Sequence, residues 1–247
     1  MQNLQKNTIT KGAIALGLSA ILASSAIAED DGAFVGLEVG LTSVKAEAKA
    51  TAPMAVTNTA KDILPSLAIK GGYKWFFGDS KRFGTRAYGI VGVGTGSLTQ
   101  LSTTLAQGGG NASFISGSRH TYYTTYIDYM VGADALFNFA NSDSFTFGLF
   151  AGVGLGGTTW AANGKEFEPK GGTGKGRSYA NFQVALNVGL RANIAKTHGI
   201  EVGGRFYLPD AEIFNAVGAT TAQGQAITTT TTHARPWAIN LSYIFNF

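Results

Sequence analysis

The sequence predicts an all-β fold: an eight-stranded antiparallel transmembrane β-barrel with short periplasmic turns and four longer extracellular loops. Three observations predict it. Long segments alternate apolar and polar residues with a period of two, their connections alternate between short and long, and after residue 28 no apolar stretch is long enough for a membrane helix. One face of each such strand suits lipid, and the other suits a polar interior.

Composition excludes several other classes of protein. Charged residues make up only 14% of the chain, against about 25% in a typical soluble domain, and the 34 glycines disfavour a helix-rich enzyme. The absence of Cys excludes a disulfide scaffold, thiol catalysis and Cys-ligated zinc. With only three His residues for a metal cluster, we expect no metal and no cofactor.

The N-terminal segment, residues 1–28, is typical of a secretory signal peptide ahead of a barrel domain at 29–247. Lys6 and Lys11 form its positive region, a short apolar core follows, and Ala-Ile-Ala at 26–28 is a small-x-small cleavage site. The core is shorter than the about 20 residues of a spanning helix. Removal of these two lysines leaves 17 of the 19 basic residues against 15 acidic ones, so no nucleic-acid partner is expected.

The first four predicted strands are 33–41, 64–77, 85–95 and 122–139. In the first, Val and Leu alternate with Gly and Glu, and in the second, aliphatic and aromatic residues alternate with small residues and lysines. The third has the weakest pattern, because Ile90 breaks an alternation that points Arg86 inward and Val91 and Val93 outward. The fourth alternates apolar residues with Thr, Asp, Gly and Asn over a length that few globular strands reach.

The last four predicted strands are 145–155, 179–195, 200–208 and 237–247. Apolar residues alternate with Thr and Gly in the first of these. The pattern in 179–195 is the strongest in the chain, since every second residue from Ala180 to Ile194 is apolar and most residues between them are polar. The two remaining strands repeat this alternation.

The connections between these strands support the barrel. Three are short, at 78–81, 141–144 and 196–199, and four are long, at 43–63, 96–121, 156–178 and 209–235. Short turns on one side and long loops on the other are typical of outer-membrane barrels. Aromatic residues cluster at the strand ends, which predicts two interfacial girdles that include Phe76 and Trp160. The tract Thr228–Thr232 is β-prone and is expected to extend strands seven and eight.

Both ends of the predicted mature chain carry a family resemblance. Residues 28–36 read Ala-Glu-Asp-Asp-Gly-Ala-Phe-Val-Gly, and the chain ends in Leu-Ser-Tyr-Ile-Phe-Asn-Phe. Both segments resemble Helicobacter-type outer-membrane proteins, the Hop/Hor-like group of small outer-membrane barrels. The alternating Tyr243, Phe245 and Phe247 resemble the C-terminal signal read by the barrel assembly machinery. The resemblance implies an integral outer-membrane protein from a family that includes adhesins, porins and members of unknown role.

The inward-facing charges are the most informative candidate site. They comprise four acids and five bases: Glu38, Asp128, Asp134, Glu201, Lys70, Lys74, Arg86, Arg191 and Arg205. Threading the strands up and down places Glu38 near Lys70 on a neighbouring strand and sets Arg191 opposite Glu201. Buried ions must be paired or hydrated, so these residues form either a structural salt-bridge network or a selectivity lining for ions. Inward glycines leave volume for a narrow wet path.

Other candidate sites carry weaker signals. A lipid-modifying hydrolase would draw on Ser118, His120, His233 and Ser242, but no distinctive motif surrounds them, and we expect no enzyme. The Lys-containing segments 45–62 and 165–177 are either solvated loops or basic patches that bind lipopolysaccharide phosphates.

The predicted function is therefore structural or surface-interacting: membrane integrity, lipopolysaccharide contact or host-surface contact by a monomer. The expected partners are outer-membrane lipids, lipopolysaccharide, the barrel assembly machinery during biogenesis and a host or surface ligand. The first alternative is a narrow porin-like channel for ions or small solutes, and the second is a lipid-modifying enzyme.

Overall fold

Every element in the described part of the chain is a strand. The computed structural model describes residues 30–51, 56–108, 111–142, 144–163, 173–175, 180–208, 211–220 and 226–247. The strands are β1 (Gly32–Thr51), β2 (Val56–Phe77), β3 (Phe83–Gly108), β4 (Asn111–Asn141), β5 (Phe145–Asn163), β6 (Thr173–Lys175), β7 (Ala180–Ile194), β8 (His198–Leu208), β9 (Ala211–Thr220), β10 (Ala226–Ala234) and β11 (Trp237–Asn246). The predicted signal peptide, 1–28, lies outside the described residues.

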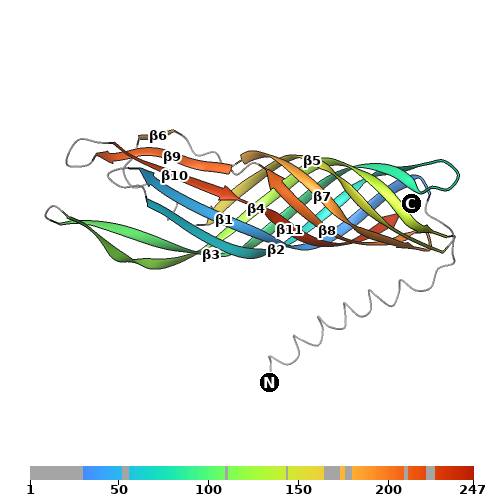
Figure 1. Cartoon of the computed structure of the whole chain (residues 1–247), viewed down its shortest axis with the longest axis horizontal. Helices are drawn as coiled ribbons and strands as arrows, with labels where there is room; N and C mark the ends of the chain where they lie inside the picture. The colour runs from blue at the N-terminus through green and yellow to red at the C-terminus, as the bar shows by residue number, and fades with distance from the viewer. Residues whose placement is uncertain are drawn as a thin grey trace, which may run out of the picture.

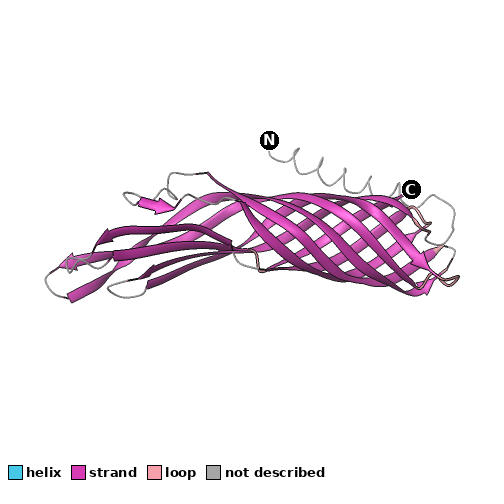
Figure 2. Ribbon diagram, turned by 90° about the horizontal axis from the view of Figure 1, so that it is seen from above, coloured by secondary structure: helices cyan, strands magenta, loops and turns pink. Residues whose placement is uncertain are grey.

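Eight of these strands close into the predicted antiparallel barrel. Neighbours follow the order β11-β8-β7-β5-β4-β3-β2-β1, and β11 pairs with β1 to complete the ring (Figure 1). The closing ladder runs from Phe34 opposite Asn246 to Thr42 opposite Ala238. The crossing strands of the closed cylinder are visible from above (Figure 2). The eight-stranded fold predicted from the alternation is confirmed.

Polarity is inverted relative to a soluble protein. Along β7, Leu186, Val188 and Leu190 are exposed on the outside, whereas Asn187 and Arg191 between them are buried inside. The same alternation on the other barrel strands gives an outward surface of exposed aliphatic and aromatic side chains, here called the apolar belt. Its members on β1 are 41–53% exposed: Val35, Leu37, Val39 and Leu41. So large a continuous apolar surface is typical of the lipid-facing side of a transmembrane barrel.

Several strands continue past the belt where the sequence predicted loops. The predicted loops 43–63 and 96–121 are mostly hairpin, and the β1–β2 and β3–β4 connections shrink to 52–55 and 109–110. These extensions project from one end of the barrel (Figure 1). The prediction was wrong here because it relied on apolar alternation. Beyond the belt no lipid demands an apolar face, so Thr, Ser and Ala continue the ladder with little apolar signal.

Part of the predicted loop 209–235 is also a hairpin. β9 pairs with β10, and β10 pairs with the extension of β1 from Lys45 opposite Ala234 to Thr51 opposite Thr228. The β-prone tract Thr228–Thr232 is therefore a strand, as predicted. β6 adds to the outer edge of β9.

A bulge separates β10 from β11. Thr42 pairs with Ala238 and Lys45 pairs with Ala234, so three steps along β1 face four steps along its partner. The extra residue falls at Pro236, whose missing N–H interrupts the ladder. A bulge changes the direction of neighbouring side chains, and here Arg235 is buried while Pro236 is exposed.

At the opposite end of the barrel, three short turns connect the strands where the sequence predicted them. Lys81, Ala195 and Lys196 adopt positive φ in these turns. Asp30, just ahead of β1, accepts hydrogen bonds from Lys81 and Lys196. This residue therefore ties the start of the barrel to two separate turns.

Side chains fill the lumen in three apolar clusters. The first cluster lies at the end of the barrel that carries the strand extensions and comprises Val44, Ala46, Ala60, Leu64, Leu98, Tyr126 and Trp160. The middle holds Phe34, Tyr88, Ile90, Met130, Ala185, Tyr207, Ala238 and Ile244, and a third cluster comprises Phe76, Leu136 and Phe150. Trp160 and Phe76 were predicted for the outer girdles but are 2% and 9% exposed, because both occupy inward positions of their strands.

Inward glycines provide room for these side chains. A Cβ at Gly132 would lie 2.6 Å from Cζ of the Tyr88 ring, and one at Gly203 would lie 2.8 Å from Cζ of Phe150. At these two positions the volume that the sequence suggested for a wet path is therefore occupied by aromatic rings.

Candidate functional site

The lumen holds all nine of the sequence-predicted charges. Each points inward and is at most 7% exposed: Glu38, Lys70, Lys74, Arg86, Asp128, Asp134, Arg191, Glu201 and Arg205. The strict alternation of the barrel strands places them there, since each lies at an inward position between belt residues.

Arg86 joins two acids from different strands. Its Nε donates to Asp134 Oδ2 at 2.8 Å, and its Nη1 donates to Glu201 Oε1. Lys70 Nζ donates to the other oxygen of Glu201 at 2.7 Å. The Arg86 guanidinium also lies 4.7 Å from the centroid of the Phe150 ring. Glu201 is therefore compensated by two cations.

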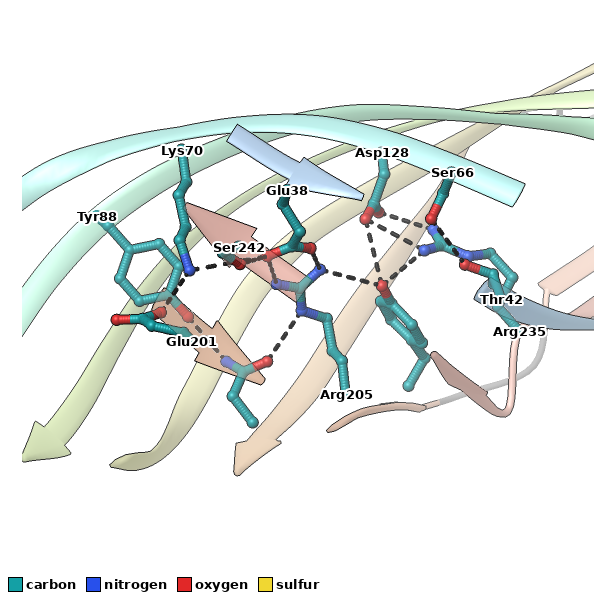
Figure 3. A network of polar contacts seen from close by, with 12 residues as sticks. Glu38, Thr42, Ser66, Lys70, Tyr88, Asp128, Glu201, Arg205, Arg235 and Ser242 are labelled. Atoms are coloured by element: carbon teal, nitrogen blue, oxygen red, sulfur yellow. Dashed lines mark hydrogen bonds and ion pairs between the residues drawn. The ribbon is translucent and has the colours of Figure 1, made fainter. Parts of the chain in front are cut away.

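Glu38 continues this network (Figure 3). Arg205 Nη1 lies 3.1 Å from Glu38 Oε1, and Ser242 Oγ donates to Glu38 Oε2 at 3.2 Å. Lys70 Nζ lies 3.8 Å from Glu38 Oε2. The predicted approach of Glu38 and Lys70 is thus present, but each residue has a nearer ionic partner.

Arg235 is the network residue that sequence reasoning missed. Its guanidinium pairs with Asp128 at 2.8 Å and donates to the Tyr207 hydroxyl at 2.6 Å. It lies 4.0 and 4.1 Å from the ring centroids of Tyr126 and Tyr207, a favourable cation–π geometry. The sequence assigned Arg235 to a loop. The signal that could have found it is Pro236, because a proline between two strand patterns indicates a bulge.

The network is formally neutral. Four acids alternate with four bases: Glu38, Asp128, Asp134, Glu201, Lys70, Arg86, Arg205 and Arg235. Such balance offsets the large desolvation cost of burying each ion.

Lys74 and Arg191 also make polar contacts in the lumen. Lys74 Nζ donates to Asn246 Oδ1 at 2.8 Å. Arg191 lies opposite Glu201 in the β7–β8 register, as the threading predicted, and its Nη1 donates to Asn138 Oδ1 at 3.4 Å.

Little space remains within the network. A cavity of about 20 Å³ touches Glu38, Lys70 and Glu201, and another of about 10 Å³ touches Asp128 and Arg235. Each volume suits about one water molecule. In chemical terms the site is a packed, internally compensated polar core.

The described residues contain no group of His, Asp or Glu side chains that could hold a metal ion. No helix in this part of the chain is long and apolar enough to cross a membrane.

The residues considered for a hydrolase do not form one site. Ser242 and His233 are both buried inside, and their partners on β1 are Glu38 and Ala46, eight residues or about 26 Å apart along the strand. Ser242 donates to Glu38, and His233 packs against Trp160 at 5.0 Å between ring centroids. Ser118 and His120 belong to the β3–β4 hairpin, opposite Ser102 and Gln100.

Two residues of the predicted C-terminal assembly signal, Tyr243 and Phe245, lie on the outward face of β11, and Phe247 directly follows this strand. Tyr243 Oη is 2.7 Å from His198 Nδ1, and the rings of Phe245 and Phe247 meet edge to face at 5.2 Å. Phe247 is 77% exposed.

The family of the chain follows from its sequence. A family model described as "Helicobacter outer membrane protein" matches residues 68–247, well over half of the chain. The chain belongs to this family. The predicted family resemblance is thereby confirmed, with the C-terminal segment inside the matched residues, and this member of the family is an outer-membrane β-barrel.

Comparison with solved structures finds bacterial proteins of low sequence identity. Ail, the attachment invasion locus protein of Yersinia pestis, is similar with 12% identity and a TM-score of 0.32, covering 87% of this chain and 99% of that chain; that structure is a complex with the heparin analogue sucrose octasulfate. Neisserial surface protein A is similar with 13% identity, a TM-score of 0.32 and the same coverage. A Pseudomonas aeruginosa FadL homologue has 8% identity and a TM-score of 0.28, covering 87% and 90%. A comparison with curated proteins gave no match.

Proposed function

We propose that this member of the Helicobacter outer membrane protein family is a non-conducting barrel that acts at the cell surface. It would strengthen the membrane and support a β-structured extension for contact with lipopolysaccharide or a host surface. The observation that carries this proposal is the filled lumen, in which a neutral ionic network lies among three apolar clusters.

The extension supports a role outside the membrane. β3 has 26 residues and β4 has 31, whereas a tilted strand needs about 9–11 to cross a bilayer. We assign the extended end to the cell exterior and the short turns to the periplasm, the usual arrangement of such barrels.

Cysteine labelling tests this sidedness. The chain has no Cys, so a single introduced thiol gives an unambiguous signal. Thr59→Cys, exposed on the β2 extension, should react with a membrane-impermeant maleimide on intact cells. Ser80→Cys, exposed in a short turn, should react only after the outer membrane is permeabilised. The reverse pattern would contradict the assignment.

Planar-bilayer recording tests the closed lumen. Purified, refolded protein should give no discrete conductance steps in salt solution, because large side chains occupy the lumen at three levels. As a matched pair, Tyr126→Ala removes an inward ring and Tyr129→Ala removes a belt ring. Regular, ion-selective steps from the unmodified protein would overturn the proposal in favour of a narrow channel.

A further inference from the structure

Charged residues replace the apolar belt at one point on the outward face of β1 and β2. These strands run side by side past the closed part of the barrel (Figure 1). The belt ends there at Ile63, which is 53% exposed and lies opposite Ser43. Two residues further, or about 7 Å along the strand, Lys45 lies opposite Lys61. This pair is therefore at the depth where a lipid changes from acyl chain to polar headgroup.

The pair belongs to a small cationic group, here called the lysine patch: Lys45, Glu47, Lys49 and Lys61. Glu47 lies 2.6 Å from the ammonium groups of both Lys45 and Lys49. These contacts lower the pKa of Glu47 to about 2, so the carboxylate is ionised at neutral pH. Three positive charges and one negative charge leave the patch with a net charge of two positive.

Lys45 and Lys61 are like charges on paired strands. Like charges directly opposite one another on neighbouring strands destabilise a sheet, and Glu47, the one carboxylate of the patch, is shared between Lys45 and Lys49. Asp62 belongs to the opposite face, because its partner Val44 points inward, and its Oδ1 accepts a hydrogen bond from the Ile63 N–H. Lys45 and Lys61 therefore present adjacent positive charges directly above the lipid-facing surface.

We propose that the lysine patch binds the lipid A phosphates of lipopolysaccharide at the outer surface of the membrane. This proposal rests on the sidedness given above and deepens the surface role by naming a ligand and its site. Phosphate suits the site because ammonium groups form charge-assisted hydrogen bonds with its oxygens, and one phosphate between cross-strand lysines would relieve their repulsion.

The test uses full-length protein refolded in neutral-lipid vesicles, with and without purified lipopolysaccharide. The variants are Lys61→Gln, Lys45→Gln/Lys61→Gln, and Arg82→Gln as a control that removes an exposed charge at the short-turn end. Lipopolysaccharide should raise the unfolding midpoint of the unmodified protein and of Arg82→Gln. The apparent Kd should weaken about fivefold for each lysine removed, and the loss should shrink at high salt.

Two further ligands identify the group that is bound. Enzymatically dephosphorylated lipopolysaccharide should lose the stabilising effect, and phosphatidylglycerol at equal phosphate concentration should stabilise less than lipopolysaccharide. Full stabilisation by dephosphorylated lipopolysaccharide, equal stabilisation by phosphatidylglycerol, or an unchanged Kd in the double variant would each overturn the proposal. The bilayer recording is independent of these results, so a conducting barrel would refute the closed lumen without affecting the phosphate site.

Discussion

Individual ion pairs in the lumen should contribute different amounts to the free energy of unfolding, according to their geometry. Glu201 accepts hydrogen bonds from both Lys70 and Arg86. Glu201→Gln would leave two buried cations poorly compensated and should cost about 3–5 kcal/mol. Lys70→Met should also destabilise, and the double variant should recover part of the loss because Arg86 keeps Asp134. Urea unfolding of the refolded barrel measures all three.

A second double-mutant cycle, on Glu38 and Lys70, provides a coupling energy to compare with that of Lys70 and Glu201. These groups lie 3.8 Å apart and each has a nearer ionic partner, so their coupling should be smaller than that of Lys70 with Glu201. Equal couplings, or strictly additive losses in both cycles, would show that the observed distances do not govern stability.

His233 should make stability depend on pH. It lies beyond the apolar belt, level with Ala46, and burial lowers its pKa from 6.5 to about 4. Below pH 6.5 the unfolded chain binds a proton that the folded protein excludes, so stability falls as the pH drops from about 6.5 towards 4. The loss is at most about 3 kcal/mol.

The variant His233→Phe tests this assignment. It keeps an aromatic ring against Trp160 but cannot titrate, so the unfolding midpoint should change less over this pH range than in the unmodified protein. The same pH slope in both proteins would assign the effect to other groups.

At the scale of the element, much of the barrel could be predicted because lipid and lumen impose a period of two. The alternation in 179–195 predicted β7 to within one residue at each end. The extensions could not be predicted in this way, since no apolar face is required beyond the belt. The inward position of the charges could be predicted because side chains alternate between the two faces of a strand. Their pairing could not, because it depends on strand register and side-chain rotamer. Glu201 and Arg191 face each other in register, yet Glu201 reaches Lys70 and Arg86.

The Pro236 bulge supplies an element-scale prediction. Pro236→Ala keeps the extra residue of the bulge, so Arg235 should stay on Asp128 and the unfolding midpoint should change little. Arg235→Gln also keeps the bulge but removes the cation from the buried Asp128 carboxylate, which should cost about 3–5 kcal/mol. Urea unfolding of the refolded barrel measures both variants.

Rescue separates this cause from general damage to the strand. Asp128→Asn in the Arg235→Gln background removes the uncompensated charge and should restore part of the lost stability. No rescue would indicate that the pairing of Arg235 with Asp128 does not contribute to stability.

On the scale of the whole molecule, Asp30 connects the start of the barrel to two turns. Hydrogen bonds from Lys196 and Lys81 lower the pKa of Asp30, so its contribution to stability is present above pH 3.8 and is lost as the pH falls further. The group is 45% exposed, and exposed ion pairs are weak. Asp30→Asn should therefore cost less than about 1 kcal/mol, and the difference should vanish in 1 M salt. A large, salt-independent loss in urea unfolding would contradict this view.

The separation of network partners along the chain has a consequence for assembly. Glu38 and Ser242 are 204 positions apart, and Lys70 and Glu201 are 131 apart. A partial sheet that lacks β8 and β11 holds Lys70 and Arg86 without Glu201, and Glu38 without Arg205. Its future lumen is therefore electrostatically incomplete, and water must solvate charges that the finished barrel compensates internally. Non-local contacts of this kind slow folding, and they make closure a single cooperative event in which the last strands complete the hydrogen-bond ring and neutralise the interior together.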